Sequence, residues 1–324
     1  MEYQYLIDVN DQANWHYPIV NREPGGNVWE EARTIHFPMG KDSLFRVTDS
    51  VFHPQPNAHC HYHRDAYEIF FWSMAPFDFY SDGKVAEVEP GCITLHRPYE
   101  PHGFGFREIT RKVGFFHRMD MTLEDGMCGA LLREKRPDAR KQPDFPKVGP
   151  VLPDIIRAED PVDYPRVPWQ EMDSVRHISR PLATERFDGV TMKMLIARWE
   201  TGGVKEVWAA ELEKGFIAES NPYPLKTEML YVTEGEVRFT VYDDTFVAHK
   251  ECIVKLPKYG AYRIEALTDA VVYDVGGQTE WFTFFRDRSS IRAANPARFA
   301  DAAFMRELKS RHNCEIRAIS GSLD

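Results

Sequence analysis

The chain has 324 residues, a formal net charge of −10 at pH 7 and a 43% share of hydrophobic residues. This hydrophobic share excludes a disordered chain, and the length allows two domains or two copies of one module. Because nucleic-acid affinity comes mainly from Lys and Arg that neutralise phosphates, an acidic chain without a basic cluster is not expected to bind nucleic acid. We expect a small molecule as its partner.

The first thirty residues contain neither a basic start nor an uninterrupted apolar stretch. They therefore fit no secretory signal or membrane anchor, and we expect a cytoplasmic protein that does not associate with membranes. The five cysteines lie far apart without a CxxC pair. We expect them to be reduced and mostly structural.

Alternating polar and apolar residues predict a series of short strands rich in β-branched and aromatic residues. Turn signals such as Ser81-Asp82-Gly83 separate them at the spacing of a sandwich or barrel. A helix is expected near the end, where Asn295-Pro296 offers a cap and Ala300, Phe304 and Leu308 recur four residues apart. The predicted strands are Ser43–His53, Tyr67–Trp72, Thr191–Arg198, Glu228–Thr233, Glu236–Tyr242, Glu251–Leu256 and Ala270–Val275.

A repeat emerges when the two halves are compared at a shift of 160 residues without gaps. Glu68 then falls on Glu228, and Cys92 falls on Cys252, with strands and turns in step. Between the halves, residues 133–181 hold nine of the 22 prolines together with apolar anchors such as Trp169, which favours an ordered connection over a flexible linker. We therefore predict an N-terminal barrel over residues 1–132, a connection over 133–181, and a C-terminal barrel with a terminal helix over 182–324.

Four residues of the first copy have the spacing of a metal site. His61 and His63 are two apart on a predicted strand and project to the same side, where they can bind one ion. Glu68 can add a carboxylate and His102 a third imidazole, which leaves positions for water or substrate. These ligand types suit Fe(II), Mn(II), Ni(II), Co(II) and Zn(II) about equally.

The same segments resemble the cupin superfamily. HYHRDAYE, which begins at His61, matches the first cupin motif, and PGCITLHRPYEPH, which ends at His102, matches the second. The resemblance implies an all-β fold of two cupin barrels in tandem, with His61, His63, Glu68 and His102 as metal ligands.

The second copy has lost every imidazole of this set. At the shift of 160 residues, His61 maps to Asn221, His63 to Tyr223 and His102 to Tyr262. We therefore predict one divalent metal ion per chain, in the N-terminal barrel. The C-terminal barrel is expected to be a structural and dimerising partner, and a homodimer would remove unpaired sheet edges.

Other residues of the first copy are candidates for further roles. His59 shares the strand face of the predicted ligands and is expected beside them or at the mouth of the site. His96 and His117 alternate with apolar residues, and for both a structural role is at least as frequent. All three are candidate catalytic groups. Four aromatic residues are candidate walls of a substrate pocket, although aromatics in a small barrel are usually core. These four are Phe70, Trp72, Tyr80 and Phe104.

These observations predict a metal-dependent enzyme that acts on an oxygen-rich small molecule. The resemblance offers two reaction classes: dioxygenase-type ring or C–C cleavage, and non-oxidative hydrolysis or isomerisation of a β-dicarbonyl or keto-sugar. We prefer the first, because bicupins with a single intact site are often dioxygenases. A non-catalytic ligand sensor and a seed-storage-like structural protein are the alternatives from other classes.

Overall fold

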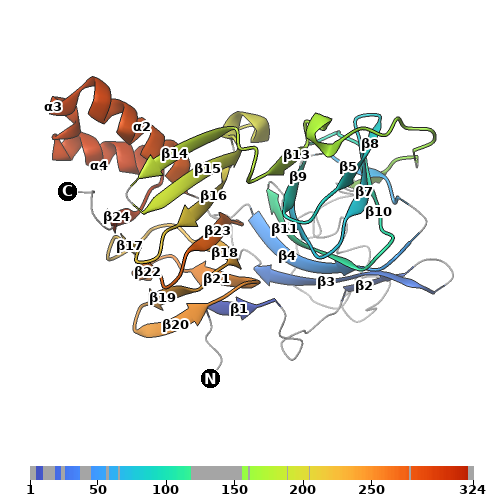
Figure 1. Cartoon of the computed structure of the whole chain (residues 1–324), viewed down its shortest axis with the longest axis horizontal. Coiled ribbons are helices and arrows are strands. Elements are labelled where there is room, and N and C mark those ends of the chain that lie inside the picture. Colours follow the sequence, from blue (N-terminus) through green and yellow to red (C-terminus); the bar gives the residue numbers. More distant parts are fainter. Residues whose placement is uncertain are drawn as a thin grey trace, which may run out of the picture. The chain divides into compact units, whose positions relative to one another are not determined.

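The computed structural model describes residues 5–9, 19–22, 26–36, 45–55, 58–64, 66–117, 155–159, 161–187, 189–203, 205–276 and 279–319. The chain forms two compact units, Asn14–His177 and Met1–Ala13 with Ile178–Asp324. We call them the N-terminal and the C-terminal barrel, because each consists of one sheet of seven strands and one of five, all paired antiparallel (Figure 1). The predicted all-β fold of two barrels is confirmed.

The N-terminal barrel has a larger sheet with strand order β13-β9-β6-β11-β4-β3-β2 and a smaller one with order β12-β5-β10-β7-β8. A short 3-10 helix, η4 (Trp169–Glu171), precedes β13. The strands are β2 (Ile19–Arg22), β3 (Val28–His36), β4 (Phe45–Phe52), β5 (His61–His63), β6 (Tyr67–Ser73), β7 (Phe77–Ser81), β8 (Lys84–Val88), β9 (Cys92–His96), β10 (His102–Gly105), β11 (Thr110–His117), β12 (Ile155–Arg157) and β13 (Val175–His177).

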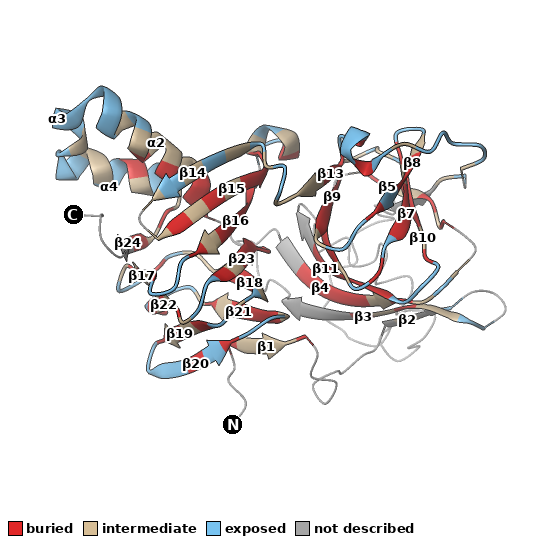
Figure 2. Cartoon of the chain, in the orientation of Figure 1, coloured by how far each residue is buried: buried red, intermediate tan, exposed pale blue. Residues whose placement is uncertain are grey.

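Local sequence explains the centre of the larger sheet. β6 and β9 bury five residues each, because they lie inside the sheet rather than at its edge; β9 is drawn largely as buried in Figure 2. β7 and β8 are joined by Asp82 and Gly83, which have φ values of 50° and 69°. A two-residue hairpin requires such left-handed residues, so the predicted turn at Ser81-Asp82-Gly83 is confirmed.

Aromatic rings make up much of the core of the N-terminal barrel. Trp72 lies 4.1 Å from Phe77 between ring centroids, and Phe52 stacks on Phe106 at 4.6 Å. Each buried ring of this size contributes about 1.5–3 kcal/mol of burial free energy. These contacts give the site described below a rigid frame.

The C-terminal barrel repeats this architecture, with strand orders β1-β21-β18-β23-β16-β15-β14 and β20-β19-β22-β17-β24. A 3-10 helix, η5 (Arg198–Thr201), lies between β15 and β16. The strands are β1 (Leu6–Asp8), β14 (Ala183–Phe187), β15 (Val190–Ile196), β16 (Val207–Leu212), β17 (Ile217–Ser220), β18 (Glu228–Glu234), β19 (Val237–Val241), β20 (Asp244–Ala248), β21 (Cys252–Leu256), β22 (Tyr262–Ala266), β23 (Ala270–Asp274) and β24 (Ile316–Ile319).

The predicted repeat is confirmed, because β7, β8 and β9 begin 160 residues before β19, β20 and β21. Edge strands correspond as well: β13 pairs with β9, and β1 pairs with β21. β1, at the opposite end of the sequence from β21, therefore completes a sheet of the C-terminal barrel. β12 and β13, which lie within residues 133–181, belong to the sheets of the N-terminal barrel; residues 118–154 lie outside the described part.

Three helices follow the last strand of the larger sheet: α2 (Trp281–Ala294), α3 (Pro296–Phe299) and α4 (Ala302–Arg311). The predicted cap at Asn295 is present, since its side chain accepts a hydrogen bond from the backbone N–H of Arg298 at 3.0 Å. The segment that was expected to form one helix forms two, α3 and α4, because the side chain of Asp301 caps the start of α4. α2 was not predicted, since its aromatic start is also typical of a strand.

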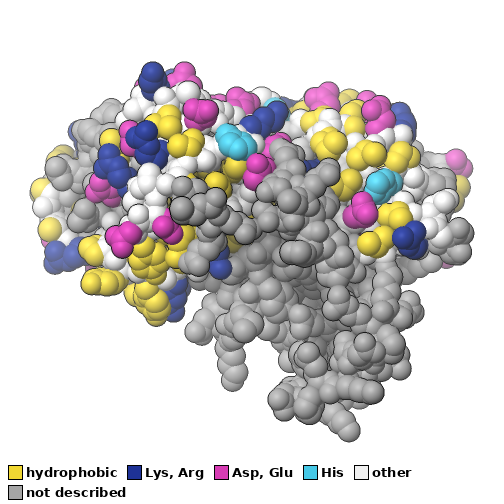
Figure 3. Space-filling model, turned by 90° about the horizontal axis from the view of Figure 1, so that it is seen from below, with side chains coloured by type: hydrophobic (Ala, Val, Ile, Leu, Met, Phe, Trp, Pro, Cys, Tyr) yellow, Lys and Arg dark blue, Asp and Glu magenta, His cyan; other side chains and the backbone are white. Residues whose placement is uncertain are grey.

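No helix in the described ranges is long and apolar enough to cross a membrane. On the face seen in Figure 3, acidic and basic side chains of the described residues are interspersed, without a continuous patch of one sign.

Candidate metal centre

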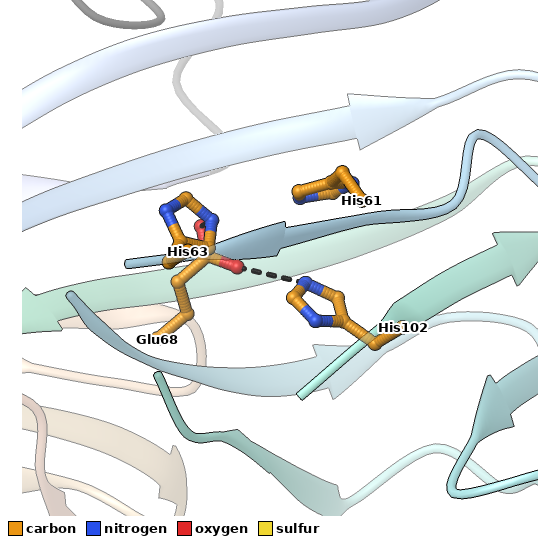
Figure 4. Close-up of side chains that lie close together, drawn as sticks. All are labelled: His61, His63, Glu68 and His102. Atoms are coloured by element: carbon orange, nitrogen blue, oxygen red, sulfur yellow. Dashed lines mark hydrogen bonds and ion pairs between the residues drawn. The ribbon is translucent and has the colours of Figure 1, made fainter. Parts of the chain in front are cut away.

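The two sheets of the N-terminal barrel bring the four predicted ligands together. In the smaller sheet, His102 on β10 lies directly opposite His61 on β5, and His63 lies on the same face as His61. Glu68 comes from β6 of the larger sheet. One ligand atom from each residue lies within 4.8 Å of all the others, and Figure 4 shows the four side chains turned toward one another.

Glu68 joins two of these imidazoles. Its Oε1 lies 3.1 Å from His63 Nε2, and its Oε2 lies 3.1 Å from His102 Nε2 (Figure 4). His63, Glu68 and His102 are each at most 1% exposed, whereas His61 is half-buried. Among the described residues of the cluster, His61 is therefore the most accessible.

Electrostatics keep this donor set in the forms that bind a metal. Burial by itself would raise the pKa of Glu68, but the charge of His63 and hydrogen bonds from His102 and His63 hold it well below its usual range. Burial, followed by the charge of His102, lowers the pKa of His61 to about 3. The carboxylate is thus ionised and the His61 ring neutral at pH 7.

Backbone contacts also fix the orientation of two rings. His61 Nδ1 lies 2.9 Å from the carbonyl of His59, and His102 Nδ1 lies 3.0 Å from the carbonyl of Glu100. Because a carbonyl only accepts, both Nδ1 atoms carry a proton, and the Nε2 lone pair of His61 is left for a metal. His102 Nε2 donates to Glu68 and would release that proton on binding an ion. Three imidazole nitrogens and one carboxylate suit a divalent transition metal, so the residues present fit such an ion.

His96, a candidate catalytic residue, lies beside the cluster. Its ring centroid is 4.0 Å from that of His102, and it is 1% exposed. Trp72 Nε1 donates to Thr94 Oγ1, which lies 2.9 Å from His96 Nε2. If the hydroxyl donates to Nε2, the His96 proton sits on Nδ1, which has no hydrogen-bond partner among the described residues. Burial, and then the charge of His102, lowers the pKa of His96 well below its usual range, so the ring is neutral.

The other two candidate catalytic histidines are placed differently. His59 precedes β5 in a left-handed conformation, with φ 49°, and stacks on Trp29 with 4.5 Å between ring centroids. Such a conformation costs a non-glycine residue free energy and is found at functional sites. The backbone of His117 ends β11, opposite Tyr67, and its side chain lies outside the described part.

A cavity of about 230 Å³ adjoins the cluster, and both His61 and Glu68 line it. Of the four predicted wall residues, Phe70 and Phe104 line the cavity. Trp72 is buried in the core instead, and Tyr80 packs beside Gly105. Lining residues that the sequence analysis missed are Trp29, Glu30, Phe52, Gln55, Ala58, Cys60, Phe106 and Lys112.

The equivalent place in the C-terminal barrel has a different chemistry. Asn221, Tyr223 and Tyr262 replace the imidazoles, and Tyr223 is 76% exposed. Glu228 is buried, and its pKa is raised by burial and by the charge of Asp274. Lys205 Nζ lies 2.7 Å and 2.8 Å from the two carboxylate oxygens of Asp274. The positive charge beside the acidic side chains of this barrel therefore comes from the Lys205 ammonium.

A second group of potential ligands lies in the C-terminal barrel. Asp8, His249 and Cys252 each have one ligand atom within 4.8 Å of the others. Burial raises the pKa of the Cys252 thiol to about 11. Because only the thiolate binds metals well, this group is a poor metal site.

No protein-family model and no curated protein match the chain. Among solved structures, it is similar to a mutant of oxalate decarboxylase from Bacillus subtilis (12% identity, 98% of this chain and 89% of that chain, TM-score 0.49). It is also similar to oxalate decarboxylase from Lactobacillus farciminis in a formate complex (11% identity, 91% and 94%, TM-score 0.49). A third match is a cupin 2 conserved barrel domain protein from Leptotrichia buccalis (10% identity, 85% and 98%, TM-score 0.49).

At these levels of similarity, the chain's own topology and motifs decide its classification. Both barrels have the same order of strands in their two sheets, and the motif residues His61, His63, Glu68 and His102 converge inside the first. The chain thus has the fold of a two-barrel cupin with a three-histidine, one-glutamate cluster in its N-terminal barrel.

Proposed function

We propose that the chain is a metal-dependent enzyme that cleaves a ring or a carbon–carbon bond of an oxygen-rich small molecule with dioxygen. The observation that carries this proposal is the contact between the four-residue cluster and a cavity lined by aromatic rings. A site for one divalent ion at the end of a small, largely apolar cavity is typical of enzymes that act on small molecules.

A divalent ion at His61, His63, Glu68 and His102 would supply Lewis acidity and, if it is redox-active, the electrons that dioxygen chemistry needs. A molecule bound against the aromatic lining displaces water from the cavity, which strengthens its electrostatic contacts there. With the Thr94 hydroxyl donating to Nε2, the Nδ1–H of the neutral His96 ring offers a buried hydrogen-bond donor beside His102.

The test begins with the metal content of protein purified without added metal, measured by inductively coupled plasma mass spectrometry. We expect close to one ion per chain, lost in the double variant His61→Ala/His102→Ala. The loaded protein is then tested for dioxygen uptake with a panel of aromatic and diketone compounds. Turnover that continues under strict anaerobiosis would refute the oxygenase and favour non-oxidative hydrolysis or isomerisation. A protein that binds no metal after reconstitution would instead be a ligand-binding protein.

We also propose that the C-terminal barrel is a structural partner and that the chain forms a homodimer in the cytoplasm. Among the described strands, β2 and β14 end their sheets, and an unpaired edge is a liability that association would remove. Sedimentation velocity ultracentrifugation tests the dimer, and a monomer at micromolar concentration would refute it.

A further inference from the structure

We infer that the cavity beside the metal cluster selects a planar, single-ring monoanion and that Lys112 binds its charged group. This inference rests on the proposed function, because it assigns the substrate class of the same site.

The size of the cavity suits a ligand with one ring. An apolar cavity of about 150 Å³ holds benzene. The cavity here is about 230 Å³. It can therefore accommodate a benzene ring with a carboxylate substituent.

The walls favour a flat ligand. Trp29 and His59 form one stacked pair, with an angle of 14° between their rings, and Phe52 and Phe106 form another, at 27°. All four line the cavity. Aromatic side chains in a cavity wall offer contacts to an aromatic ligand that a puckered saturated ring does not make.

Lys112 provides the positive charge of the cavity. It extends from β11 and is 7% exposed, and its Nζ lies 3.6 Å from the ring centroid of Phe70 and 5.0 Å from that of Phe52. These cation–π contacts hold the ammonium against the cavity wall. Because Lys112 lines the same cavity as His61 and Glu68, one ligand can contact both the ammonium and the metal cluster.

The charge balance favours a monoanion. At formal charges, the cavity lining carries two acidic side chains, Glu30 and Glu68, and one ammonium, that of Lys112. With a divalent ion in the cluster, one net positive charge remains, which a single carboxylate or phenolate neutralises. A neutral ligand would leave this charge buried, and burial of an uncompensated charge is costly.

The experiment is isothermal titration calorimetry on zinc-loaded protein, since zinc supports binding without redox turnover. The probes are benzoate, its neutral analogue benzamide, and the saturated analogue cyclohexanecarboxylate. We expect benzoate to bind about tenfold or more tightly than benzamide, because a hydrogen bond to a charged group is worth this much. We expect cyclohexanecarboxylate to bind several-fold more weakly than benzoate.

The variant Lys112→Met should weaken benzoate binding about tenfold to hundredfold and leave benzamide binding within a factor of two. Lys112→Arg retains the charge and should retain the preference for benzoate. Lys84→Met, which removes a half-exposed lysine of β8 outside this cavity, is the matched control. If Lys112→Met does not fold by circular dichroism, the comparison is made with Lys112→Gln.

Three results would overturn the inference: benzoate that does not bind at millimolar concentration, benzoate affinity unchanged in Lys112→Met, or equal binding of the saturated analogue. The zinc content of the same samples tests the proposed function separately. Protein that binds no zinc would refute that function, and the benzoate and benzamide titrations of wild type and Lys112→Met would then be made on the metal-free protein.

Discussion

The replacement His61→Ala separates the metal-binding role of the cluster from its contribution to folding. His61 is the most exposed ligand and lines the cavity, so its truncation enlarges an existing space instead of creating a buried void. At a metal concentration about one hundred times the dissociation constant, a bound ion stabilises the wild-type fold by about 2.7 kcal/mol. For a unit of this size, this raises the melting temperature by about 5–10 °C.

The loss of one imidazole from four ligands should weaken metal binding by at least about a hundredfold, since even residues that only support a ligand contribute ten- to hundredfold. At the same metal concentration the stabilisation then falls to about 0.4 kcal/mol, or about 1–2 °C. Differential scanning fluorimetry with and without metal measures both values. His53→Ala, which removes a half-exposed histidine 3.3 Å from Glu31 and outside the cluster, should retain the full shift. A His61→Ala variant with the wild-type shift and one ion per chain would refute the assignment.

Three further predictions concern stability. Burial raises the pKa of the Glu206 carboxyl from its usual value of 4.5 to about 7. Between these two pH values the folded chain keeps a proton that the unfolded chain releases. The free energy of unfolding should therefore fall by about 3 kcal/mol as the pH rises from about 4.5 to 7. Glu206→Gln should remove this fall in urea denaturation at pH 5 and pH 8, and an unchanged pH dependence would contradict the assignment. Lys205→Met leaves the Asp274 carboxylate buried without its ammonium and should cost about 3–5 kcal/mol, most of which the added change Asp274→Leu should restore. A loss below about 1 kcal/mol would show that this ion pair is not needed. In Gly103→Ala, the new Cβ would lie 2.5 Å from Cys60 Sγ, so a destabilisation of about 1–3 kcal/mol is expected in thermal unfolding, and an unchanged melting temperature would contradict it.

Features that depend on local backbone geometry could be predicted from the local sequence. The ligand pair His61 and His63 follows from the two-residue period of a strand, and the hairpin at Asp82 and Gly83 follows from the left-handed residues that it requires. The repeat made the second barrel predictable from the first, because Glu68 and Glu228 occupy equivalent strands.

The lining of the cavity depends on contacts that no local pattern encodes. Trp29 on β3, Phe52 on β4 and Lys112 on β11 are distant in sequence and become neighbours only through strand pairing, in which Thr110 lies opposite Phe52 and Phe52 opposite Glu30. Lys112 in particular sits in an alternating strand, where a lysine is ordinarily assigned to the solvent face. The contact of Lys112 with Phe70 depends on the three-dimensional structure of the barrel, so the sequence alone does not predict it.

The pairing of β1 with β21 has a consequence for the order of events during synthesis. Leu6 lies opposite Val254, so β1 pairs with a segment made about 250 residues later. At about 5–20 residues per second, the ribosome makes β21 roughly ten to fifty seconds after β1. During that interval β1 cannot form this pair, and a deletion of β1 would act on the completion of the C-terminal barrel rather than on the barrel that follows it in the sequence.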